Sequence, residues 1–327
     1  MKIAAIGGAG YIGSHTVREL LDQGHQVAVF DNFSSGLRQN LQPEAEFVYG
    51  DILNPTAIRD FLNEYQPEGV VHFAAFKAAG ESMTHPEKYS INNIMGSLNL
   101  LNACAATGVK YFVFSSSAAT YGAPQYLPMD EKHPTNPENY YGYTKLAIEQ
   151  YLKWYDQLKG IRFAALRYFN AAGYDVQGRL SGLEQKPANL LPVVMECAAG
   201  MRKSMQVFGD DYATVDGTGV RDYVHVSDLA IGHALAFARL AQGNDSFTVN
   251  LGVNSGLSVL QVIAAAEKVS GRKVNYQIVP RRPGDPAEVV ADPRMAKHLL
   301  GWEAKHSDVQ TLVETTWKAY IANGVVR

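Results

Sequence analysis

The sequence predicts an α/β fold, a Rossmann-type doubly wound parallel sheet with a smaller C-terminal α/β domain. Apolar strands alternate with helical segments of roughly 10–20 residues through the first half of the chain, which is typical of parallel sheets. A glycine-rich turn joins the first strand to the first helix, and an acidic residue ends the second strand. Together these observations indicate a sheet that binds a ligand at the carboxyl ends of its strands.

The first strand and the first helix flank the glycine-rich turn. Lys2–Ile6 is an apolar run suited to a buried strand, and a helix is expected from Ser14 to Gln23. The glycines between them allow a tight turn, close approach of a pyrophosphate and close helix packing, and the helix N-terminus offers free N–H groups to the anion. The residues of the turn assigned to a dinucleotide are Gly7, Gly10, Tyr11, Ile12 and Gly13.

The second strand, expected at His25–Phe30, ends in Asp31. Dinucleotide-binding folds carry an acidic residue at this place, where its carboxylate hydrogen-bonds the adenosine ribose. A carboxylate repels a 2′-phosphate, so NAD is favoured over NADP, although Arg38 lies nearby and keeps NADP open. Asn32 follows Asp31 and is assigned to the same cofactor site.

Two further strands are expected to contact the cofactor at their ends. The third is expected at Glu46–Ile52 and the fourth at Gly69–Ala75, with a helix from about Asn54 to Tyr65 between them. An acidic residue and an isoleucine at the end of the third strand suit the adenine edge, and small residues in the fourth let a cofactor lie against the backbone. The residues assigned from these strands are Asp51, Ile52, Phe73, Ala74 and Ala75.

Polar residues also follow the fourth and fifth strands. Lys77 comes directly after the fourth strand, and the hydroxyl-rich run Ser115–Gly122 follows the fifth strand, Tyr111–Phe114. Open α/β sheets bind ligands at this edge, although such a run is also typical of an ordinary turn. One long helix is expected in between, from Pro86 to Thr107. Lys77, Ser115 and Asn92, near the start of that helix, are assigned to the cofactor site.

Tyr141 and Lys145 are the main candidates for catalysis. They are four residues apart, so on a helix their side chains share a face. A lysine near a tyrosine favours the phenolate, and we expect it to draw the phenol pKa from about 10 toward neutrality. The phenolate oxygen then accepts a substrate proton, which makes Tyr141 the predicted general base. One serine of the preceding hydroxyl run is expected to hydrogen-bond a substrate oxygen beside it.

The composition argues against several classes of partner. The 327 residues carry a formal net charge of −3, so no basic surface is expected and nucleic acid is not a predicted partner. No apolar run reaches about 18 residues, so no membrane partner is predicted. No targeting segment is expected either, because the first residues lead directly into a strand.

Cysteines and acidic clusters give no sign of a metal site. The two cysteines, Cys104 and Cys197, lie in apolar helical contexts and are interpreted as buried thiols of a cytoplasmic protein. Asp210, Asp211 and Asp216 lie in a glycine-rich turn without a histidine or cysteine at ligand spacing. We therefore predict that the protein binds no metal ion.

The second half of the chain continues the α/β pattern. A strand is expected at Phe163–Tyr168, and amphipathic helices are expected at Leu229–Leu240, Ser258–Ser270 and Val309–Ala322. We expect residues 1–172 to form a dinucleotide-binding domain with the catalytic residues. Residues 173–327 are expected to form mainly the substrate domain, with a part at about 220–255 returning to the first domain.

The order of these motifs is that of extended short-chain dehydrogenase/reductases: a glycine turn, an acidic residue after the second strand, a serine run and a Tyr/Lys pair. Within that group the chain resembles the UDP-glucose 4-epimerase (UDP-galactose 4-epimerase) family, and the similarity extends from Lys2 to about Trp302. The segments that carry the resemblance are Phe73–Ser82, Leu166–Gly173 and Phe208–Val226.

The resemblance implies a reaction and a cofactor. It implies tightly bound NAD, a UDP-hexose substrate, and interconversion of UDP-galactose and UDP-glucose through a transient 4-keto sugar. It also implies Tyr141 as the base, Lys145 on the nicotinamide ribose and on the tyrosine, and Ser117 on the sugar O4. Three more residues have implied contacts: Lys77 with the cofactor and the substrate diphosphate, and Tyr168 and Phe169 with the nicotinamide.

The resemblance also places the nucleotide in the second half of the chain. A helix that begins at Asn189 presents N–H groups to phosphate, and Tyr174–Asn189 before it is expected to close over the substrate. Arg221 and Arg282 suit the diphosphate because a guanidinium forks onto phosphate oxygens. The residues assigned to the substrate are Lys77, Ser117, Tyr141, Asn170, Asn189, Leu190, Gln206, Val207 and Phe208 beside the uracil, Arg221, Arg282, Asp285 on the ribose, and Val289.

Two positions depart from the family pattern. Ala119-Thr120 replaces the more usual Thr-Val after the serines, which leaves the role of Thr120 open. Val289 lies near the 2-substituent of the sugar, where some relatives carry a bulky tyrosine. A smaller side chain leaves room for an N-acetyl group, so we hypothesise that UDP-N-acetylglucosamine and UDP-N-acetylgalactosamine are also accepted.

Two alternatives share the fold and the cofactor. Nucleotide-sugar 4,6-dehydratases and UDP-glucuronate decarboxylases resemble the chain, but such dehydratases carry acidic residues just after the active-site Ser/Thr, where Ala118 and Ala119 stand here. A non-catalytic NAD-sensing protein would be expected to lose Tyr141 or Lys145.

The sequence leaves two possibilities for the oligomeric state. Helices 86–107 and 140–158 either pair with their copies in a homodimer, as in relatives, or are buried within one subunit.

Overall fold

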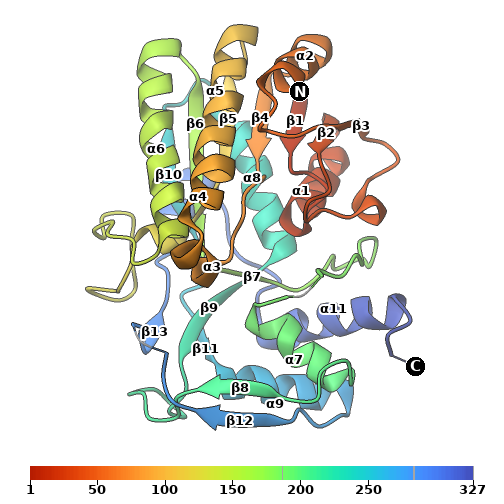
Figure 1. Cartoon of the computed structure of the whole chain (residues 1–327), viewed down its shortest axis with the longest axis vertical. Coiled ribbons are helices and arrows are strands. Elements are labelled where there is room, and N and C mark those ends of the chain that lie inside the picture. The colour runs from red at the N-terminus through yellow and green to blue at the C-terminus, as the bar shows by residue number, and fades with distance from the viewer. Residues whose placement is uncertain (186, 283, 327) are drawn as a thin grey trace.

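The structure, a computed structural model, describes residues 1–185, 187–282 and 284–326. A seven-stranded parallel sheet with the strand order β10-β6-β5-β4-β1-β2-β3 occupies the upper part of the molecule in Figure 1, which confirms the predicted fold class. The order reverses between β1 and β4, and ligands bind at such a reversal. The strands are β1 (Lys2–Ile6), β2 (Gln26–Asp31), β3 (Glu46–Tyr49), β4 (Gly69–His72), β5 (Tyr111–Ser117), β6 (Arg162–Tyr168) and β10 (Phe247–Leu251).

Helices cover both faces of this sheet because its strands are apolar on both sides. Side chains alternate along β1, so Ile3 and Ala5 enter one core while Ala4 and Ile6 enter the other. The first core packs under α1 (Tyr11–Asp22), α8 (Val226–Ala241) and α10 (Arg294–Leu300). The second packs under α2 (Pro55–Tyr65), α5 (Gly96–Thr107) and α6 (Tyr140–Lys159).

The helix predicted as one unit from Pro86 to Thr107 is interrupted. Short helices α3 (Ala79–Thr84) and α4 (Pro86–Tyr89) lead into a π-helical segment, Ser90–Met95, before α5 begins. Such wide turns recur at functional sites. Here the wide turn contains Asn93, whose amide is buried against the chain that leaves β4.

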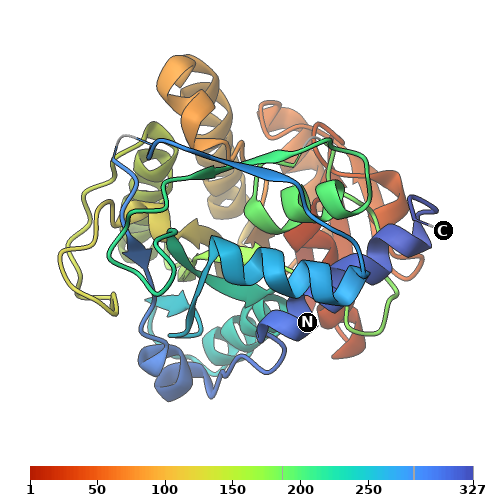
Figure 2. The same cartoon turned by 90° about the horizontal axis from the view of Figure 1, so that it is seen from below.

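A smaller region lies below the large sheet (Figure 1). Its four-stranded sheet contains β7 (Asn170–Ala172), β9 (Val220–His225), β11 (Gly256–Ser258) and β13 (Glu288–Val289), and a separate parallel pair is formed by β8 (Met205–Phe208) and β12 (Tyr276–Val279). Three helices pack against one another there, as Figure 2 shows from below. They are α7 (Leu190–Ala198), α9 (Val259–Ser270) and α11 (Val309–Ala322).

The chain passes between the two regions more than once. Residues 220–225 pair in the smaller sheet as β9, whereas α8 and β10 return to the large sheet. The domain boundary expected at residue 172 stays a prediction. Among the described residues, no helix is both long and apolar enough to cross a membrane.

Candidate active site

The glycine turn leaves no room for side chains. Gly7 has a φ of +80°, and a Cβ at this position would lie 2.7 Å from the backbone nitrogen of Ala74. A Cβ on Gly13 would lie 2.4 Å from the carbonyl oxygen of Gly7. Helix α1 begins at Tyr11, earlier than predicted, and its N-cap Gly10 makes no side-chain cap. The N–H groups of its first turn are thus free to bind a pyrophosphate, so the turn fits a dinucleotide.

The acidic ends of β2 and β3 lie next to this turn. The carboxylate of Asp31 accepts hydrogen bonds from the N–H of Ala9 (3.0 Å) and of Phe33 (2.7 Å). Burial raises the pKa of Asp31, and these two N–H groups oppose the shift. Asp51 accepts a hydrogen bond from the side chain of Asn32 (2.9 Å), so the structure brings the three polar residues assigned to the adenosine together.

The chain that leaves β4 forms the wall opposite the glycine turn. The N–H groups of Phe73 and Ala74 both donate to the carbonyl of Ile6, at 2.8 and 3.2 Å, which brings this segment and Ala75 beside the turn. β4 ends at His72 rather than at Ala75 because these bonds leave the regular ladder. The remaining residue assigned to the adenine, Ile52, is buried under α5.

Tyr141 and Lys145 lie on the first two turns of α6. Asn139 caps the helix by accepting from the N–H of Gly142 (2.9 Å), and the Ser82 hydroxyl accepts from the N–H of Tyr141 (3.0 Å). The Lys145 ammonium donates to the carbonyl of Ser115 (2.7 Å) and lies 5.8 Å from the centroid of the Tyr141 ring. The helix start is therefore fixed, and the lysine is held beneath the phenol by β5.

The expectation that Lys145 lowers the pKa of Tyr141 is wrong for the protein alone. Burial raises the pKa of Tyr141, opposed by its hydrogen bond with Ser117. Burial also lowers the pKa of Lys145 to about 7, opposed by the negative charge of Glu149. The physical reason is that both groups lie in a medium of low dielectric constant, which favours their neutral forms.

The hydroxyl run after β5 is an ordered part of the site. Ser115 hydrogen-bonds the hydroxyl of Tyr168, and Ser117 is paired in register with Tyr168 on β6. Ser117 accepts from the N–H of Ala119 (3.1 Å), while the buried Thr120 donates to the carbonyl of Ser117 (2.9 Å). Thr120 therefore holds the turn that presents Ser117. Phe169 follows Tyr168 between β6 and β7 and is half-buried.

Sequence reasoning missed Asn93, although it assigned its neighbour Asn92. The Asn93 side chain accepts from the N–H of Phe76 (2.9 Å) and donates to the carbonyl of Phe76 (3.0 Å) and the hydroxyl of Thr144 (3.3 Å). The Asn92 side chain itself donates to Asn93 (3.0 Å). Nothing in an Asn-Asn pair shows which of the two amides faces inward, so the π-helical segment had to be seen first. Lys77, one residue after Phe76, pairs with a carboxylate from a distant segment.

A cavity of about 730 Å³ lies between the smaller sheet, α7 and β8. Its wall includes Asn170 on β7, two residues after β6 ends at Tyr168. Sequence reasoning missed Arg202 and Tyr223, which also line it. Nothing in the sequence context of Arg202 distinguishes it, whereas Tyr223 lies within the segment Phe208–Val226 that carries the resemblance. The predicted substrate residues in its wall are Asn170, Asn189, Leu190, Gln206, Val207, Phe208, Arg221, Arg282 and Asp285.

Two guanidinium groups extend along this cavity. Arg282 lies over the Phe208 ring, 3.8 Å from its centroid. Arg221 forms an ion pair with Asp285, so in this structure the carboxylate expected on the ribose is used to hold an arginine. Val289 pairs in register with Arg221 on β9 and is half-buried. Val289, like Lys77, Ser117 and Tyr141, is not part of the cavity wall itself.

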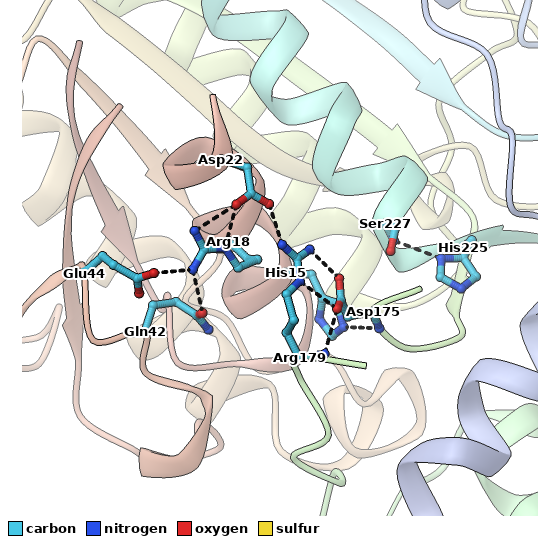
Figure 3. Close-up of polar contacts among 9 residues, drawn as sticks. All are labelled: His15, Arg18, Asp22, Gln42, Glu44, Asp175, Arg179, His225 and Ser227. Carbon is cyan, nitrogen blue, oxygen red and sulfur yellow. Dashed lines mark hydrogen bonds and ion pairs between the residues drawn. The ribbon is translucent and has the colours of Figure 1, made fainter. Parts of the chain in front are cut away.

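The segment between β7 and α7 is anchored on α1 (Figure 3). The Tyr11 hydroxyl donates to the carbonyl of Gly173. His15 donates from Nδ1 to the carbonyl of Tyr11 (2.8 Å), and its Nε2 accepts from the N–H of Asp175 (3.0 Å). The helix that starts at the glycine turn therefore also holds the chain that leads to the nucleotide cavity.

Charged groups extend this anchor along the helix (Figure 3). Arg179 bridges Asp175 and Asp22, each at 2.7 Å, and Arg18 links Asp22 to Glu44. Farther along the segment, Glu184 forms an ion pair with Lys77. The lysine that was expected to contact the diphosphate is therefore paired with a carboxylate in this structure. The segment has no helix or strand in its described residues, 173–185 and 187–189. Ion pairs and hydrogen bonds thus fix its position.

A sheet with this strand order, a glycine turn and a Tyr/Lys pair on α6 defines a dinucleotide-dependent enzyme of the short-chain dehydrogenase/reductase type. The model of the NAD dependent epimerase/dehydratase family matches residues 3–252, and the chain belongs to this family. Among its relatives, the UDP-glucose 4-epimerase of Lacticaseibacillus casei is 44% identical over 317 residues, which cover 97% of this chain and 96% of the relative.

Solved structures give the same result. The UDP-glucose 4-epimerase of Brucella ovis in complex with NAD is 41% identical, with a TM-score of 0.95 and 97% of each chain covered. The UDP-glucose 4-epimerase of Bifidobacterium longum in complex with NAD+ and UDP is 38% identical, with a TM-score of 0.92 and 99% of each chain covered. The similarity therefore includes both the large sheet and the smaller region.

The hydrogen bonds of His15 predict a pH-dependent stability. Burial lowers its pKa to about 4, so the unfolded chain binds one more proton than the folded chain between that value and about 6.5. The stabilisation by neutral His15 is therefore complete above this window and is lost as the pH falls through it. We expect His15→Asn to lower the free energy of unfolding by about 2 kcal/mol at neutral pH, where two hydrogen bonds are lost.

Denaturant unfolding at several pH values measures this effect. The difference between wild type and His15→Asn should shrink as the pH falls from about 6.5 toward 4. His298→Asn is the matched control, because His298 is exposed on α10 and its replacement should leave the free energy of unfolding nearly unchanged. A difference that stays constant with pH would contradict the assignment of His15 as a neutral hydrogen-bond acceptor.

Proposed function

We propose that the protein is an NAD-dependent isomerase that interconverts UDP-galactose and UDP-glucose by reversible oxidation at C4 of the hexose. The observation that carries this proposal is the position of the 730 Å³ cavity, whose wall begins at Asn170, two residues after the partner of Ser117. A nucleotide in that cavity would direct its sugar toward Ser117 and Tyr141. The similarity to UDP-glucose 4-epimerases over nearly the whole chain supports the same activity.

The residues around the glycine turn suit NAD. The N–H groups at the start of α1 would hold its pyrophosphate, Asp31 its adenosine ribose and Lys145 its nicotinamide ribose. Bound NAD would supply an acceptor for the C4 hydride, which it later returns, and a positive charge near the phenol. That charge matters because burial alone keeps Tyr141 protonated.

Side chains of the protein would transfer the proton of the sugar 4-hydroxyl. Tyr141 would take the proton of the sugar 4-hydroxyl and give it back, while Ser117 holds the same oxygen. The sugar passes through a 4-keto form that is planar at C4, so its configuration inverts if the ring turns before the hydride returns. This requires a firm hold on the nucleotide and a loose hold on the hexose. Arg282, stacked on Phe208, and Arg221 provide the firm hold on the nucleotide.

The same features argue against the alternatives. A dehydratase needs an acid to expel the C6 hydroxyl, whereas the 3₁₀ turn after Ser117 carries Ala118 and Ala119 at the places where dehydratase relatives have acids. A protein that only senses NAD has no need for a buried lysine beneath a phenol. Absorbance of reduced nicotinamide in the purified protein, together with conversion of UDP-galactose to UDP-glucose, distinguishes the three.

Replacement of Tyr141 tests the proposed base. Tyr141→Phe removes the proton acceptor but keeps the ring, so we expect kcat for UDP-galactose to fall by about 10²–10⁴-fold with little change in stability. Product analysis by chromatography of the sugar nucleotides measures it. Tyr143→Phe is the control, because Tyr143 is exposed on the same helix and should keep the wild-type rate. A Tyr141→Phe enzyme with full activity would refute the role.

We infer further that N-acetylated UDP-hexoses are accepted. Val289 is small, half-buried and adjacent to Arg221, which suits the substituent at C2 of a sugar whose diphosphate lies on that arginine. Val289→Tyr should lower kcat/KM for UDP-N-acetylglucosamine by about 10–100-fold and leave UDP-galactose nearly unchanged, since added volume excludes the larger sugar. Val289→Ala should accept both. No turnover of the acetylated sugar by wild type would remove this inference.

A homodimer through α5 and α6 is also inferred. Trp154 and Leu158 on α6 are 61% and 70% exposed, and Ile91 and Met95 just before α5 are also exposed. Apolar side chains gathered on neighbouring helices are typical of an interface. Light scattering should give twice the mass of one chain, and Trp154→Glu should halve it.

We also infer a cytoplasmic location, because Cys104 and Cys197 are free thiols.

A further inference from the structure

A buried ion pair lies behind the catalytic candidates, between α6 and the large sheet. The side chains of Glu149 and Arg167 are 2% and 8% exposed. Glu149 accepts hydrogen bonds from Nε of Arg167 (2.9 Å), from its Nη2, and from the hydroxyl of Ser116 (2.6 Å). Both carboxylate oxygens of Glu149 thus accept hydrogen bonds. None of these three residues belongs to the site as described so far.

Each member of this cluster is a close neighbour in sequence of a residue of the site. Ser116 and Arg167 are register partners on β5 and β6, and the next register pair is Ser117 and Tyr168. Successive side chains of a strand point to opposite faces, so one pair faces α6 while the next faces the substrate side. Glu149 lies one helical turn after Lys145, on the same face of α6.

Stability alone does not explain such a pair. Removing two charges from water costs several kcal/mol per ion, and apolar residues of similar size often stabilise a fold equally well or better. The cost here is met by ideal hydrogen bonding, and the Arg167 guanidinium also stacks on Tyr121, 4.8 Å from the ring centroid. The Tyr121 hydroxyl donates in turn to Asn250 on β10 (2.6 Å). The cluster therefore joins α6 to β5 and β6 and, through Tyr121, to β10.

The cluster is also close enough to influence the charge of Lys145. Among the described residues, Glu149 is the one group whose charge raises the pKa of Lys145. His72 on β4 faces Lys145 as well, but burial and that ammonium lower its pKa so far that it stays neutral. The rings of Tyr141 and Phe114 also face the ammonium, with centroids at 5.8 and 4.8 Å.

We propose that Glu149 and Arg167 are positioning residues for the isomerase reaction: they fix α6 against the ends of β5 and β6, and their balanced charges set the charge of Lys145. The proposal rests on the function proposed above and adds two residues to its machinery. Neither residue touches the reacting atoms. Glu149 acts through Lys145 and through the hydroxyl of Ser116, the neighbour of Ser117, and Arg167 acts by neutralising and holding Glu149.

Removal of the negative charge of Glu149 and removal of the positive charge of Arg167 should shift the pH profile of kcat/KM in opposite directions. Glu149→Gln leaves the Arg167 charge uncompensated, which disfavours protons on the Tyr141/Lys145 pair, so both limbs of the kcat/KM profile should move to lower pH by about one unit. Arg167→Gln leaves the Glu149 charge, so both limbs should move to higher pH by a similar amount. The double variant removes both charges and should restore the wild-type limbs at a reduced rate.

A second readout does not need turnover. The phenolate absorbance of Tyr141, taken as the difference between each protein and its Tyr141→Phe form, should titrate at lower pH in Glu149→Gln and at higher pH in Arg167→Gln. Because this readout uses the purified protein without sugar, it is independent of the substrate. If wild type fails to convert UDP-galactose, the proposed function fails, while the absorbance shifts still decide whether the ion pair sets the charge of Lys145.

A surface ion pair between the same two elements is the matched control. Asp156 on α6 binds Arg162 on β6 at 3.0 Å, and Arg162 is 46% exposed. Asp156→Asn with Arg162→Gln should leave the profile unchanged. Unshifted limbs, or shifts in the same direction for Glu149→Gln and Arg167→Gln, would overturn the proposal. If Arg167→Gln does not fold, Arg167→Lys replaces it; this variant keeps the charge and must keep the wild-type limbs while Glu149→Gln shifts them.

Discussion

The contact between the glycine turn and the chain that leaves β4 constrains the whole site. Ala74 approaches Gly7 so closely that no side chain fits, and Gly13 packs on the carbonyl of Gly7. This contact sets where α1 begins and where β4 must leave the sheet. Since α1 holds the segment before α7 through His15, the position of the nucleotide cavity depends on the same turn.

The sequence predicted those parts of the fold that local patterns determine. The strand Lys2–Ile6 with its glycine turn, Asp31 at the end of β2, and helix α6 lie where expected. The π-helical segment Ser90–Met95 was not predicted, because its wide turn is stabilised by the tertiary hydrogen bonds of Asn93. No pattern within one helix contains that information.

Candidate residues show the same division. Their types and places at strand ends were predictable, and the predicted nucleotide residues line one cavity. Their partners were not predictable, because pairs such as Lys77 with Glu184 or Arg221 with Asp285 join positions far apart in the chain. The prediction of a lowered Tyr141 pKa failed for a related reason. Whether burial or a neighbouring charge has the larger effect on this pKa depends on packing that the sequence does not display.

The anchor of the segment before α7 has a consequence for exchanging parts between homologues. Tyr11, His15 and Asp22 on α1 bind Gly173, Asp175 and Arg179, which lie nearly half of the chain away in sequence. A chimaera that joins the N-terminal half of one relative to the C-terminal half of another divides these partners between two parents. The two halves are therefore compatible only when α1 and residues 173–179 come from the same parent.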